Sequence, residues 1–368
     1  MATYIYNLPN WPHFTWDHKL VYPLLVEVRY RQGRLLGRME GLGFHLQEEA
    51  NLQTLTMDVL KSSEIEGEIL DPDQVRSSIA RRLGMDIGGL IPSDRYVDGV
   101  VEMMLDATLN YQNELTVDRF CAWHSALFPS GRSGIYKIIV GSWRRNKIDD
   151  PMQVVSGAMG KEKVHFQAPE SEKVEEEMNQ LIRWFNEDSQ MDSIIKAAIA
   201  HLWFVTIHPF EDGNGRIARA LADMQLSRSD ISSQRFYSMS TQIRKERKEY
   251  YDVLEHTQKG SMDISKWLVW FLKCLDNSIS ETNNTLELVW KKSRFWETNA
   301  QTIFNERQKL IILKLMDGFN GKLNSSKWAK ITKVSQDTAI RDINDLIEKG
   351  ILKKEERGGR STSYFLQY

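Results

Sequence analysis

The chain has 368 residues, which is too long for a single core of ordinary size and indicates two or three domains. Its composition, with 41% hydrophobic and 27% charged residues, is that of a globular protein and excludes a disordered or collagen-like chain. With 48 Lys and Arg against 50 Asp and Glu, the formal net charge of -2 excludes a global positive field for nucleic acid or anionic membranes.

Cysteine content and hydropathy indicate the compartment. Cys121 and Cys274 lie far apart among apolar residues, so the sequence predicts neither a disulfide framework nor a cysteine-based zinc site. The N-terminus lacks the basic start and apolar run of a secretory signal. The most apolar stretch, residues 194–210, contains Lys and His side chains and is too short to cross a bilayer, so it predicts a buried helix. We expect a cytoplasmic protein without a membrane partner.

Helical periodicity dominates the first half of the chain. From about Leu20 to Leu70, apolar residues recur at spacings of three and four, which predicts at least two helices that end at Asp71-Pro72. Residues 154–166 have apolar ends around a glycine-rich middle and predict a short hairpin. Pro169 followed by Ser171, as the N-cap, predicts the start of a further helix. The apolar stripe of that helix consists of Val174, Met178, Leu181, Ile182 and Phe185.

The last part of the chain has the pattern of a small separate domain. Helices are expected at about residues 307–316, 326–331 and 336–348, the third with Ser335 as its N-cap. A two-stranded ribbon, residues 351–352 and 364–366, is expected around Gly358-Gly359. Three helices followed by a ribbon are typical of a winged helix.

The charges of this domain bear on nucleic-acid binding. Residues 301–368 contain 13 Lys and Arg and 8 Asp and Glu, which is a local basic excess. The third helix, however, carries several carboxylates that would face DNA phosphates at an electrostatic cost. They are Asp337, Asp342, Asp345 and Glu348, beside Arg341. We therefore expect a role in protein interaction or dimer packing, and nucleic-acid binding is the less favoured reading.

The strongest chemical signal is the 12-residue run from His208 to Arg219, HPFEDGNGRIAR. Gly213 and Gly215, on either side of Asn214, allow the backbone to approach a ligand closely. The unpaired N–H groups at the start of the following helix, together with its dipole, favour an anion. Arg216 and Arg219 share one face of that helix and add guanidinium groups that suit phosphate oxygens. These features predict a polyphosphate site.

Two further side chains of the run suit catalysis on a bound phosphate. Asp212 is suited to hold a divalent cation, because Mg²⁺ usually takes one or two carboxylates plus phosphate oxygens. A neutral imidazole at His208 is suited to accept a proton from an attacking hydroxyl group. Each feature alone is equally typical of a structural turn or a helix end, and it is their conjunction in one run that favours a catalytic site.

The run from His208 to Arg219 resembles the signature of Fic-domain proteins, His-Pro-Phe-x-(Asp/Glu)-Gly-Asn-Gly-Arg-x-x-Arg, at every fixed position. Most Fic enzymes transfer AMP from ATP to a Ser, Thr or Tyr hydroxyl of a target protein, with Mg²⁺ and release of pyrophosphate. The resemblance implies that His208 is the base, Asp212 the metal ligand, Gly213 to Gly215 the anion hole, and Arg216 and Arg219 the phosphate clamps. The relatives called Doc, which phosphorylate, carry Lys where this chain has Gly215, so nucleotidyl transfer is favoured.

Two other segments are similar to parts of this family. The hairpin at residues 154–166 looks like the flap that clamps the target by strand addition, although an ordinary surface hairpin has the same pattern. Tyr250 and Tyr251 lie in a segment that resembles the region where the adenine ring is held, since an aromatic wall can stack on a base. Adjacent tyrosines in a helix are also typical of a core.

The segment Ser62-Ser63-Glu64-Ile65-Glu66-Gly67 matches the family's inhibitory pattern, (Ser/Thr)-x-x-x-Glu-(Gly/Asn). Ser62 and Glu66 are four residues apart and face the same way on a helix. Because this segment precedes the catalytic run, the resemblance implies an N-terminal helix that lies over its own active site. Glu66 would then pair with Arg219 in the place of the ATP γ-phosphate.

We therefore expect a mainly α protein with three parts: an N-terminal helical segment with the inhibitory helix at residues 1–100, a Fic core with a hairpin flap at 101–290, and a winged helix at 300–368. The expected activity is self-inhibited AMP transfer from ATP to a target protein, with Mg²⁺, and homo-oligomer formation stays open. One alternative is the reverse reaction, in which Glu66 helps water to remove AMP from a modified protein. Another is a nucleotide-sensing regulator that binds DNA through the winged helix.

Overall fold

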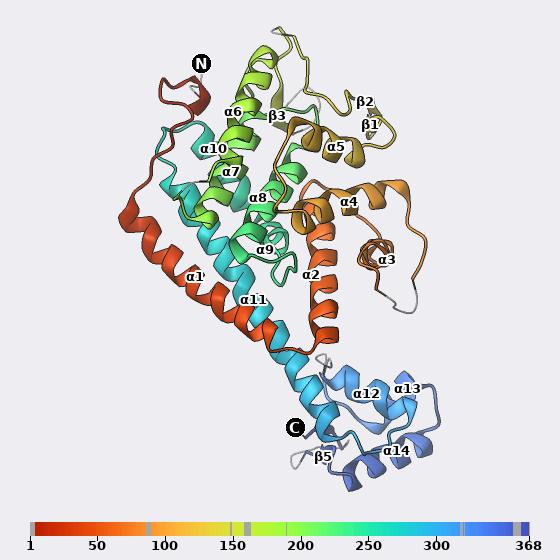
Figure 1. Cartoon of the computed structure of the whole chain (residues 1–368). Helices are drawn as coiled ribbons and strands as arrows, with labels where there is room; N and C mark the ends of the chain where they lie inside the picture. The colour runs from red at the N-terminus through yellow and green to blue at the C-terminus, as the bar shows by residue number, and fades with distance from the viewer. Residues whose placement is uncertain are drawn as a thin grey trace. The chain divides into compact units, whose positions relative to one another are not determined.

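The structure is a computed structural model that describes residues 4–85, 90–147, 149–157, 163–188, 190–316, 319, 321–355 and 362–367. It divides into two compact units, Met1–Glu281 and Thr282–Tyr368. Helices predominate in both units and strands are few and short, which confirms the predicted mainly α class (Figure 1). The predicted division into three parts stays a prediction.

A short 3-10 turn, η1 (Ile5–Asn7), precedes three helices, α1 (His18–Glu40), α2 (Phe44–Ile65) and α3 (Pro72–Arg82). The first two confirm the helices predicted between residues 20 and 70. Asp71-Pro72, expected only to end this pattern, also begins α3. The Asp71 carboxylate accepts hydrogen bonds from the N–H groups of Asp73 and Gln74, and Pro72 takes the first helical position, where no N–H is needed.

Helices α4 (Arg95–Leu109) and α5 (Val117–Leu127) are followed by two small hairpins. The first joins β1 (Arg132–Ser133) to β2 (Tyr136–Lys137), and the second joins β3 (Gln153–Ser156) to β4 (Lys163–Gln167). Both pairs are antiparallel. The second confirms the hairpin predicted at residues 154–166, and its turn lies outside the described residues.

The helix predicted after Pro169 is present, but its start differs from the prediction. A 3-10 turn, η2 (Ser171–Lys173), leads into α6 (Val174–Asn186). Ser171 is not the N-cap, because its hydroxyl donates to the Asn146 carbonyl oxygen at 2.7 Å, whereas Lys173 precedes the helix. The predicted apolar stripe is buried except at Ile182, which is half-buried.

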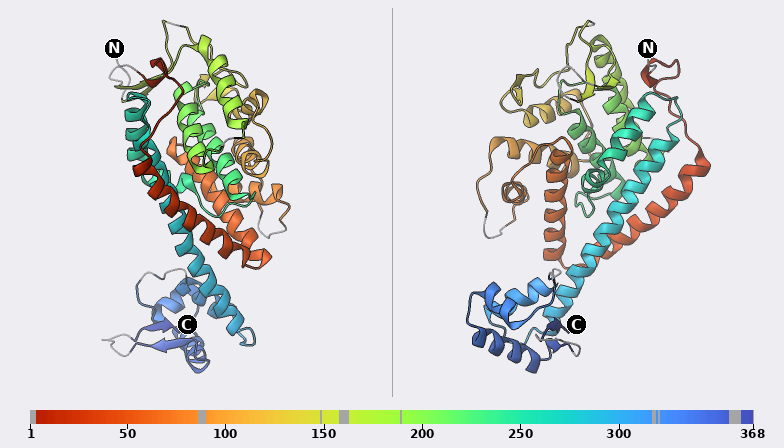
Figure 2. Two further views of the ribbon diagram at one scale, coloured as in Figure 1. Left: turned by 60° about the vertical axis from the view of Figure 1, so that its left-hand side comes forward. Right: turned by 180° about the vertical axis from the view of Figure 1, so that it is seen from behind.

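Helices α7 (Ser193–Ile207) and α8 (Asn214–Asp230) pack against each other inside the first unit (Figures 1 and 2). All but the first residue of α7 are buried, which confirms the buried helix predicted there. Helices α9 (Met239–Lys245) and α10 (Arg247–Gln258) and the first part of α11 (Ser265–Thr298) complete the unit. Arg31 links α1 to α11, because its guanidinium donates hydrogen bonds to Asp276 at 3.0 Å and to Ser280 at 2.9 Å. Among the described residues, no helix combines the length and apolarity that crossing a bilayer requires.

The second unit contains α12 (Glu306–Met316), α13 (Ser325–Thr332) and α14 (Gln336–Glu348), followed by the antiparallel strands β5 (Leu352–Lys354) and β6 (Tyr364–Leu366). These elements appear in the predicted order around a core that includes Trp328. Ser335 caps α14 by accepting from Thr338 N–H, and Gly350 follows the helix with a positive φ of 71°. The turn at Gly358-Gly359 lies outside the described residues, and the winged-helix assignment stays a prediction.

Two carboxylates of α14 pair with other side chains of the second unit. Asp342 is buried and accepts hydrogen bonds from Arg307 at 2.7 and 2.9 Å and from Asn305 at 2.9 Å. Asp345 accepts from Gln308 and Lys349. Both carboxylates are thus paired with side chains of the second unit, and the argument that they disfavour nucleic-acid binding stays a prediction.

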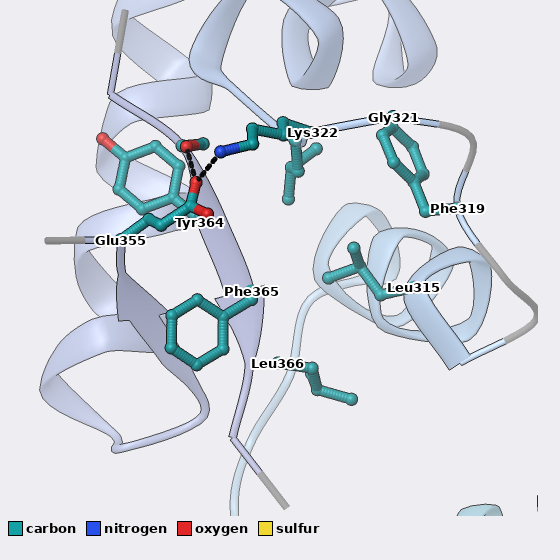
Figure 3. Close-up of a pocket in the computed structure, with 10 residues that line it drawn as sticks. Leu315, Phe319, Gly321, Lys322, Glu355, Tyr364, Phe365 and Leu366 are labelled. Carbon is teal, nitrogen blue, oxygen red and sulfur yellow. Dashed lines mark hydrogen bonds and ion pairs between the residues drawn. The ribbon is translucent and has the colours of Figure 1, made fainter. Parts of the chain in front are cut away.

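The second unit also contains a pocket beside β6 (Figure 3). Leu315, Phe319 and Leu366 supply apolar lining. At its rim, the Glu355 carboxylate accepts from Lys322 at 2.7 Å and from the Ser363 hydroxyl. All of its lining residues belong to the second unit, so it is separate from the site described next.

Candidate functional site

The predicted catalytic run forms the connection between α7 and α8. His208 ends α7 in the left-handed region, with φ of 52°, and Gly213 precedes α8 with φ of 80°. A left-handed residue reverses the chain at a helix end. A side chain at Gly213 would meet the Phe128 ring at 2.9 Å, so glycine is required here for conformation and for space.

The Asn214 side chain closes this loop. Its side-chain oxygen accepts from Phe210 N–H at 3.0 Å, and its side-chain nitrogen donates to the Phe210 carbonyl oxygen at 2.8 Å. Phe210 is fully buried and stacks on His124, with ring centroids 4.1 Å apart. The loop is therefore rigid before any ligand arrives.

Arg144 holds the loop from outside and was not predicted. Its Nε donates to the His208 carbonyl oxygen at 2.7 Å, a terminal nitrogen donates to the Pro169 carbonyl oxygen at 2.5 Å, and its backbone N–H donates to the Pro209 carbonyl oxygen at 2.9 Å. Burial lowers the pKa of Arg144 to about 10, and the group stays charged at neutral pH. No local sequence pattern marks this residue, because its partners are backbone carbonyls of distant segments.

His208 has the electrostatic state that a general base needs. Desolvation, followed by the positive charge of Arg144, lowers the pKa of its imidazole to about 4, so the ring is neutral at pH 7. Its Nδ1 lies 3.4 Å from the Val205 carbonyl oxygen. That contact favours the proton on Nδ1 and leaves Nε2 with the lone pair.

Asp212 precedes the start of α8 by two residues, and its oxygens already have donors. One accepts from Gly213 N–H at 2.6 Å and the other from the hydroxyl of Ser133 on β1. Among the described residues, no cluster of three or more His, Cys, Asp or Glu side chains suits a metal ion. One carboxylate and a neighbouring hydroxyl still fit the hard oxygen donors that Mg²⁺ takes together with phosphate oxygens.

The second arginine of the run is held by the last turn of α2. Arg219 is 2% exposed and donates to the Ser62 hydroxyl and carbonyl oxygens, both at 2.9 Å, and to Glu66 at 2.8 Å. Glu66 follows α2, and Gly67 reverses the chain with φ of 89°. A Cβ at Gly215 would lie 2.3 Å from the Glu66 carboxylate, so that carboxylate sits directly against the glycine-rich loop.

The first arginine is held by a second carboxylate that sequence analysis missed. Arg216 is 1% exposed and donates to Glu68 at 2.7 Å and to the Tyr96 hydroxyl at 2.6 Å. Its guanidinium also lies over the Phe128 ring, 5.1 Å from the centroid. Burial raises the pKa of Glu68, against the opposing effect of Arg216. The segment after α2 thus places one carboxylate on each arginine of the run.

The two tyrosines of α10 have different environments. Tyr250 is 1% exposed, shares a hydrogen bond with His201 Nε2 at 2.9 Å and packs against Trp267 and Trp270. In this state it is a core residue with no free face for a base. Tyr251 is half-buried, and its hydroxyl lies 3.4 Å from Glu66. Tyr251 thus contacts Glu66, and the buried Tyr250 lies within electrostatic reach of Arg219.

The helix that carries Glu66 is anchored to the core by buried charges. Asp58 of α2 accepts from the Ser238 hydroxyl at 2.5 Å, close to an ion pair between Arg235 and Asp223 at 2.8 Å. Desolvation raises the pKa of Asp58 and raises that of Asp223 to about 8. Each of these two carboxylates has one buried oxygen without a hydrogen-bond partner among the described residues, which fits a retained proton.

Two buried donors of the arginines remain unsatisfied. Among the described residues, neither Nε of Arg216 nor one terminal nitrogen of Arg219 has a hydrogen-bond partner. Buried guanidinium N–H groups are normally paired, so these donors are suited to oxygens of a ligand. The structure therefore brings together His208, the glycine loop, both arginines, Ser62 and Glu66.

Two protein families match the segments that contain Glu66 and the run from His208 to Arg219. Residues 114–226 match the Fic/DOC family, and residues 4–85 match a domain of unknown function, DUF4172. The protein adenylyltransferase fic-1 of Caenorhabditis briggsae is 47% identical over 60 residues, which is 16% of this chain and 12% of that protein. The protein adenylyltransferase Fic of Drosophila ananassae is 26% identical over 219 residues, covering 58% of this chain and 39% of that protein.

These curated relatives are much longer than the segments that they share with this chain, because the matches span 12% and 39% of their lengths. A solved structure resembles nearly the whole chain. It is a Fic family protein from Desulfovibrio desulfuricans, with a TM-score of 0.55 over 97% of this chain and 98% of that one. Its sequence identity is 20%, so the likeness is one of fold.

Proposed function

We propose that this chain, which contains a Fic domain, is a protein adenylyltransferase that moves AMP from ATP to a hydroxyl side chain of a target protein. One observation carries the proposal. A neutral His208 stands beside a glycine loop and two buried arginines that retain unsatisfied N–H donors. The named activity of the relatives adds support.

The phosphates of ATP would lie over Gly213 and Gly215. The space beside Gly215 is taken by the Glu66 carboxylate, an anion that a phosphate would replace, and the start of α8, which has no side-chain cap, supplies the positive end of a helix dipole. Arg216 and Arg219 would bind the outer phosphates with charge-assisted hydrogen bonds. Tyr251 lies on the side where the base would stack, and we leave Tyr250 out of the nucleotide site because it is buried.

Mg²⁺ would be held by the Asp212 carboxylate together with phosphate oxygens, with Ser133 orienting that carboxylate. When bound, the ion neutralises charge on the phosphates and on the leaving pyrophosphate. Without the ion, Gly213 N–H and the Ser133 hydroxyl hold the Asp212 side chain in place.

The chemical step is a displacement at the α-phosphorus. The target hydroxyl oxygen bonds to that phosphorus, the bond to the bridging oxygen of the β-phosphate breaks, and pyrophosphate leaves. The hydroxyl proton goes to Nε2 of His208, whose low pKa keeps it free of a proton beforehand. Arg144 keeps His208 in place through the backbone of the loop.

In the structure, Glu66 pairs with Arg219 and Glu68 pairs with Arg216, and we call this arrangement the closed state. We further propose that the closed state inhibits this reaction. Glu66 occupies Arg219 and lies against Gly215, so the outer phosphate of ATP cannot pair with that guanidinium. Glu68 occupies Arg216 in the same way. Both carboxylates belong to one segment after α2, so a movement of this segment would release both arginines.

The test is a label-transfer assay with the Glu66→Gly variant and Mg²⁺. With ATP labelled at the α-phosphate, protein in a cell lysate or the enzyme itself should acquire label. ATP labelled at the γ-phosphate should give no label that depends on the added enzyme. Label from the γ-phosphate would show phosphorylation, and no label from either position would contradict the proposed function.

Two further assays test the alternative functions, AMP removal and DNA binding. If the cellular reaction is AMP removal, Glu66→Gly should abolish the release of AMP from a labelled target while the parent releases it. If the second unit is a DNA-binding regulator, a gel shift at two salt concentrations should show a complex that weakens with salt.

Cys121 and Cys274 are free thiols, which is compatible with our placement of the protein in a reducing compartment.

A further inference from the structure

The flap hairpin contains an irregularity at a chemically distinctive residue. Strands β3 and β4 pair Val154 with Phe166 and Val155 with Val164, so the register shifts between these pairs. His165 is the residue of β4 left without a partner in the register. A bulge of this kind bends a strand and re-aims the side chain of the extra residue.

The re-aimed imidazole joins the flap to a helix. His165 Nδ1 lies 2.6 Å from a carboxylate oxygen of Glu255 on α10, and its Nε2 lies 2.5 Å from the Ser156 hydroxyl on β3. The other Glu255 oxygen accepts from Lys259 at 2.7 Å. The pKa of Glu255 is lowered, because the hydrogen bonds from Lys259 and His165 outweigh its desolvation. Both side chains are about a quarter exposed, so water does not fully screen the contact.

Helix α10 also reaches the proposed nucleotide side. Tyr251, one helical turn before Glu255, contacts Glu66 through its hydroxyl, and Tyr250 is fixed in the core. The base of β4 has its own anchor, because Phe166 packs in a cluster with Tyr4 and Tyr6. The His165–Glu255 contact therefore adds a second point of attachment, nearer the end of the flap where Ser156 and Lys163 pair.

We propose that His165 is a positioning residue, held by Glu255, that fixes the flap against α10 and so places the acceptor segment of the target protein before the α-phosphate. The inference rests on the proposed function. A segment that adds to the flap as a strand inherits the position of the flap. Loss of the tether would let the flap move against the nucleotide site, and the acceptor hydroxyl would be aligned less often.

The experiment compares His165→Phe and Glu255→Gln with Glu249→Gln, an exposed carboxylate on the same helix, all in the Glu66→Gly background. The acceptor is a mixture of strand-forming decapeptides, each with one Ser, Thr or Tyr. Rates are measured with α-labelled ATP for AMP transfer to peptide and, without peptide, for AMP formation by hydrolysis. We expect the two tether variants to raise the KM for peptide about 10-fold, while the KM for ATP and the rate of hydrolysis stay within twofold.

Three outcomes would overturn the inference: an unchanged peptide KM, an equal fall of peptide transfer and hydrolysis, or the same defect in Glu249→Gln. If the Glu66→Gly parent neither transfers AMP to any acceptor nor forms AMP by hydrolysis, the proposed function fails instead. Hydrogen exchange then tests the tether separately. His165→Phe should speed exchange of the β3 and β4 amides at least fivefold and leave α7 and α8 unchanged, and identical exchange would refute the tether.

Discussion

The two sides of the catalytic loop are held in opposite ways. On the side of α2, both arginines are buried and each is paired with a carboxylate of the segment that follows that helix. On the side of the flap, Val155 and Val164 are exposed, and a partly exposed imidazole ties the hairpin to α10. The polar contacts of the first side are aimed at the groups that would bind phosphate.

This difference indicates which substrate the closed state excludes. Val155 and Val164 of the flap are exposed, whereas the N–H groups that Arg216 and Arg219 donate to Glu68 and Glu66 become free for phosphates only when those carboxylates leave. In the proposed function, inhibition therefore acts on how ATP binds. The predictions below test the two sides separately, from the largest effect on activity to the smallest.

The largest effect is expected at the residue between the two sides. In the Glu66→Gly background, His208→Ala should lower AMP transfer by about 10² to 10⁴-fold, the usual contribution of a general base. ATP affinity should change only a few-fold, because the glycine loop and the arginines remain. Label transfer and ATP binding by calorimetry measure the two effects, and the exposed His256→Ala is the matched control. Transfer within a few-fold of the parent would remove His208 from the mechanism.

The pH profile checks the same residue without a substitution. The low pKa of His208, about 4, keeps the base unprotonated throughout the neutral range. The value of kcat/KM for ATP should therefore show no acidic limb near pH 6.5 and should fall only as the pH approaches 4. An acidic limb at the ordinary histidine pKa would contradict the assigned electrostatics.

The next effect is a gain of activity. If the closed state is favoured by about 3 kcal/mol, only about 1% of molecules are competent, and Glu66→Gly should raise AMP transfer about 100-fold. Glu66→Asp should activate less, because its shorter carboxylate still lies near Arg219. Glu64→Gly is the control, because Glu64 lies in the last turn of α2, close to Glu66 in the chain, but pairs with Lys61 and Arg244. Activation by Glu64→Gly as well would attribute the gain to unwinding of α2.

A smaller gain is expected from the second carboxylate. Glu68 is more exposed than Arg216, so its pair contributes about 1 kcal/mol, and Glu68→Gln should raise transfer about fivefold. The double variant with Glu66→Gly should exceed either single variant. Initial rates across ATP concentrations measure this. A fall in transfer would mean that Glu68 orients Arg216 for phosphate and does not compete with it.

The sequence predicted the parts of the site that are contiguous. The run from His208 to Arg219 contains the proposed base, the loop and both arginines, and the four-residue spacing of Ser62 and Glu66 predicted that they face the same way, as their shared contact with Arg219 shows. The helical class followed from periodicity, and the hairpin followed from apolar ends around a glycine-rich middle. These features depend on neighbours in the chain, so their residue types alone define them.

The remaining features depend on contacts between distant segments. Arg144, Glu68 and Tyr96 approach the loop from other parts of the fold, and no spacing in the sequence connects them with it. Tyr250 and Tyr251 are adjacent and chemically alike, so only packing distinguishes the buried ring from the one at the site. The α3 start was missed although its signal was present, since Asp71-Pro72 is also an N-cap followed by a proline.

The smallest effect on activity is expected from the buried carboxylates that anchor α2, where the change should appear in stability. Desolvation raises the pKa of Asp223 to about 8, far above the value near 4 of an unfolded chain. Between about pH 4 and pH 8, the folded protein therefore retains a proton that the unfolded chain has already lost. The contribution of this group to the free energy of unfolding is therefore largest below pH 4. It falls as the pH rises to 8, by at most about 1.4 kcal/mol per pH unit.

Asp223→Asn should remove most of this slope, because the amide cannot titrate and Asp58 loses its neighbouring negative charge. Urea unfolding at pH 5, 6.5 and 8 measures the slope, and label transfer in the Glu66→Gly background should stay within about threefold. The partly exposed Asp276, whose pKa is also raised by burial, gives the control Asp276→Asn, which leaves the Asp58 and Asp223 pair intact and should keep the slope. An unchanged slope in Asp223→Asn would show that the proton lies elsewhere. A large rise in transfer would show that this anchor, in addition to Glu66 and Glu68, holds the α2 side closed.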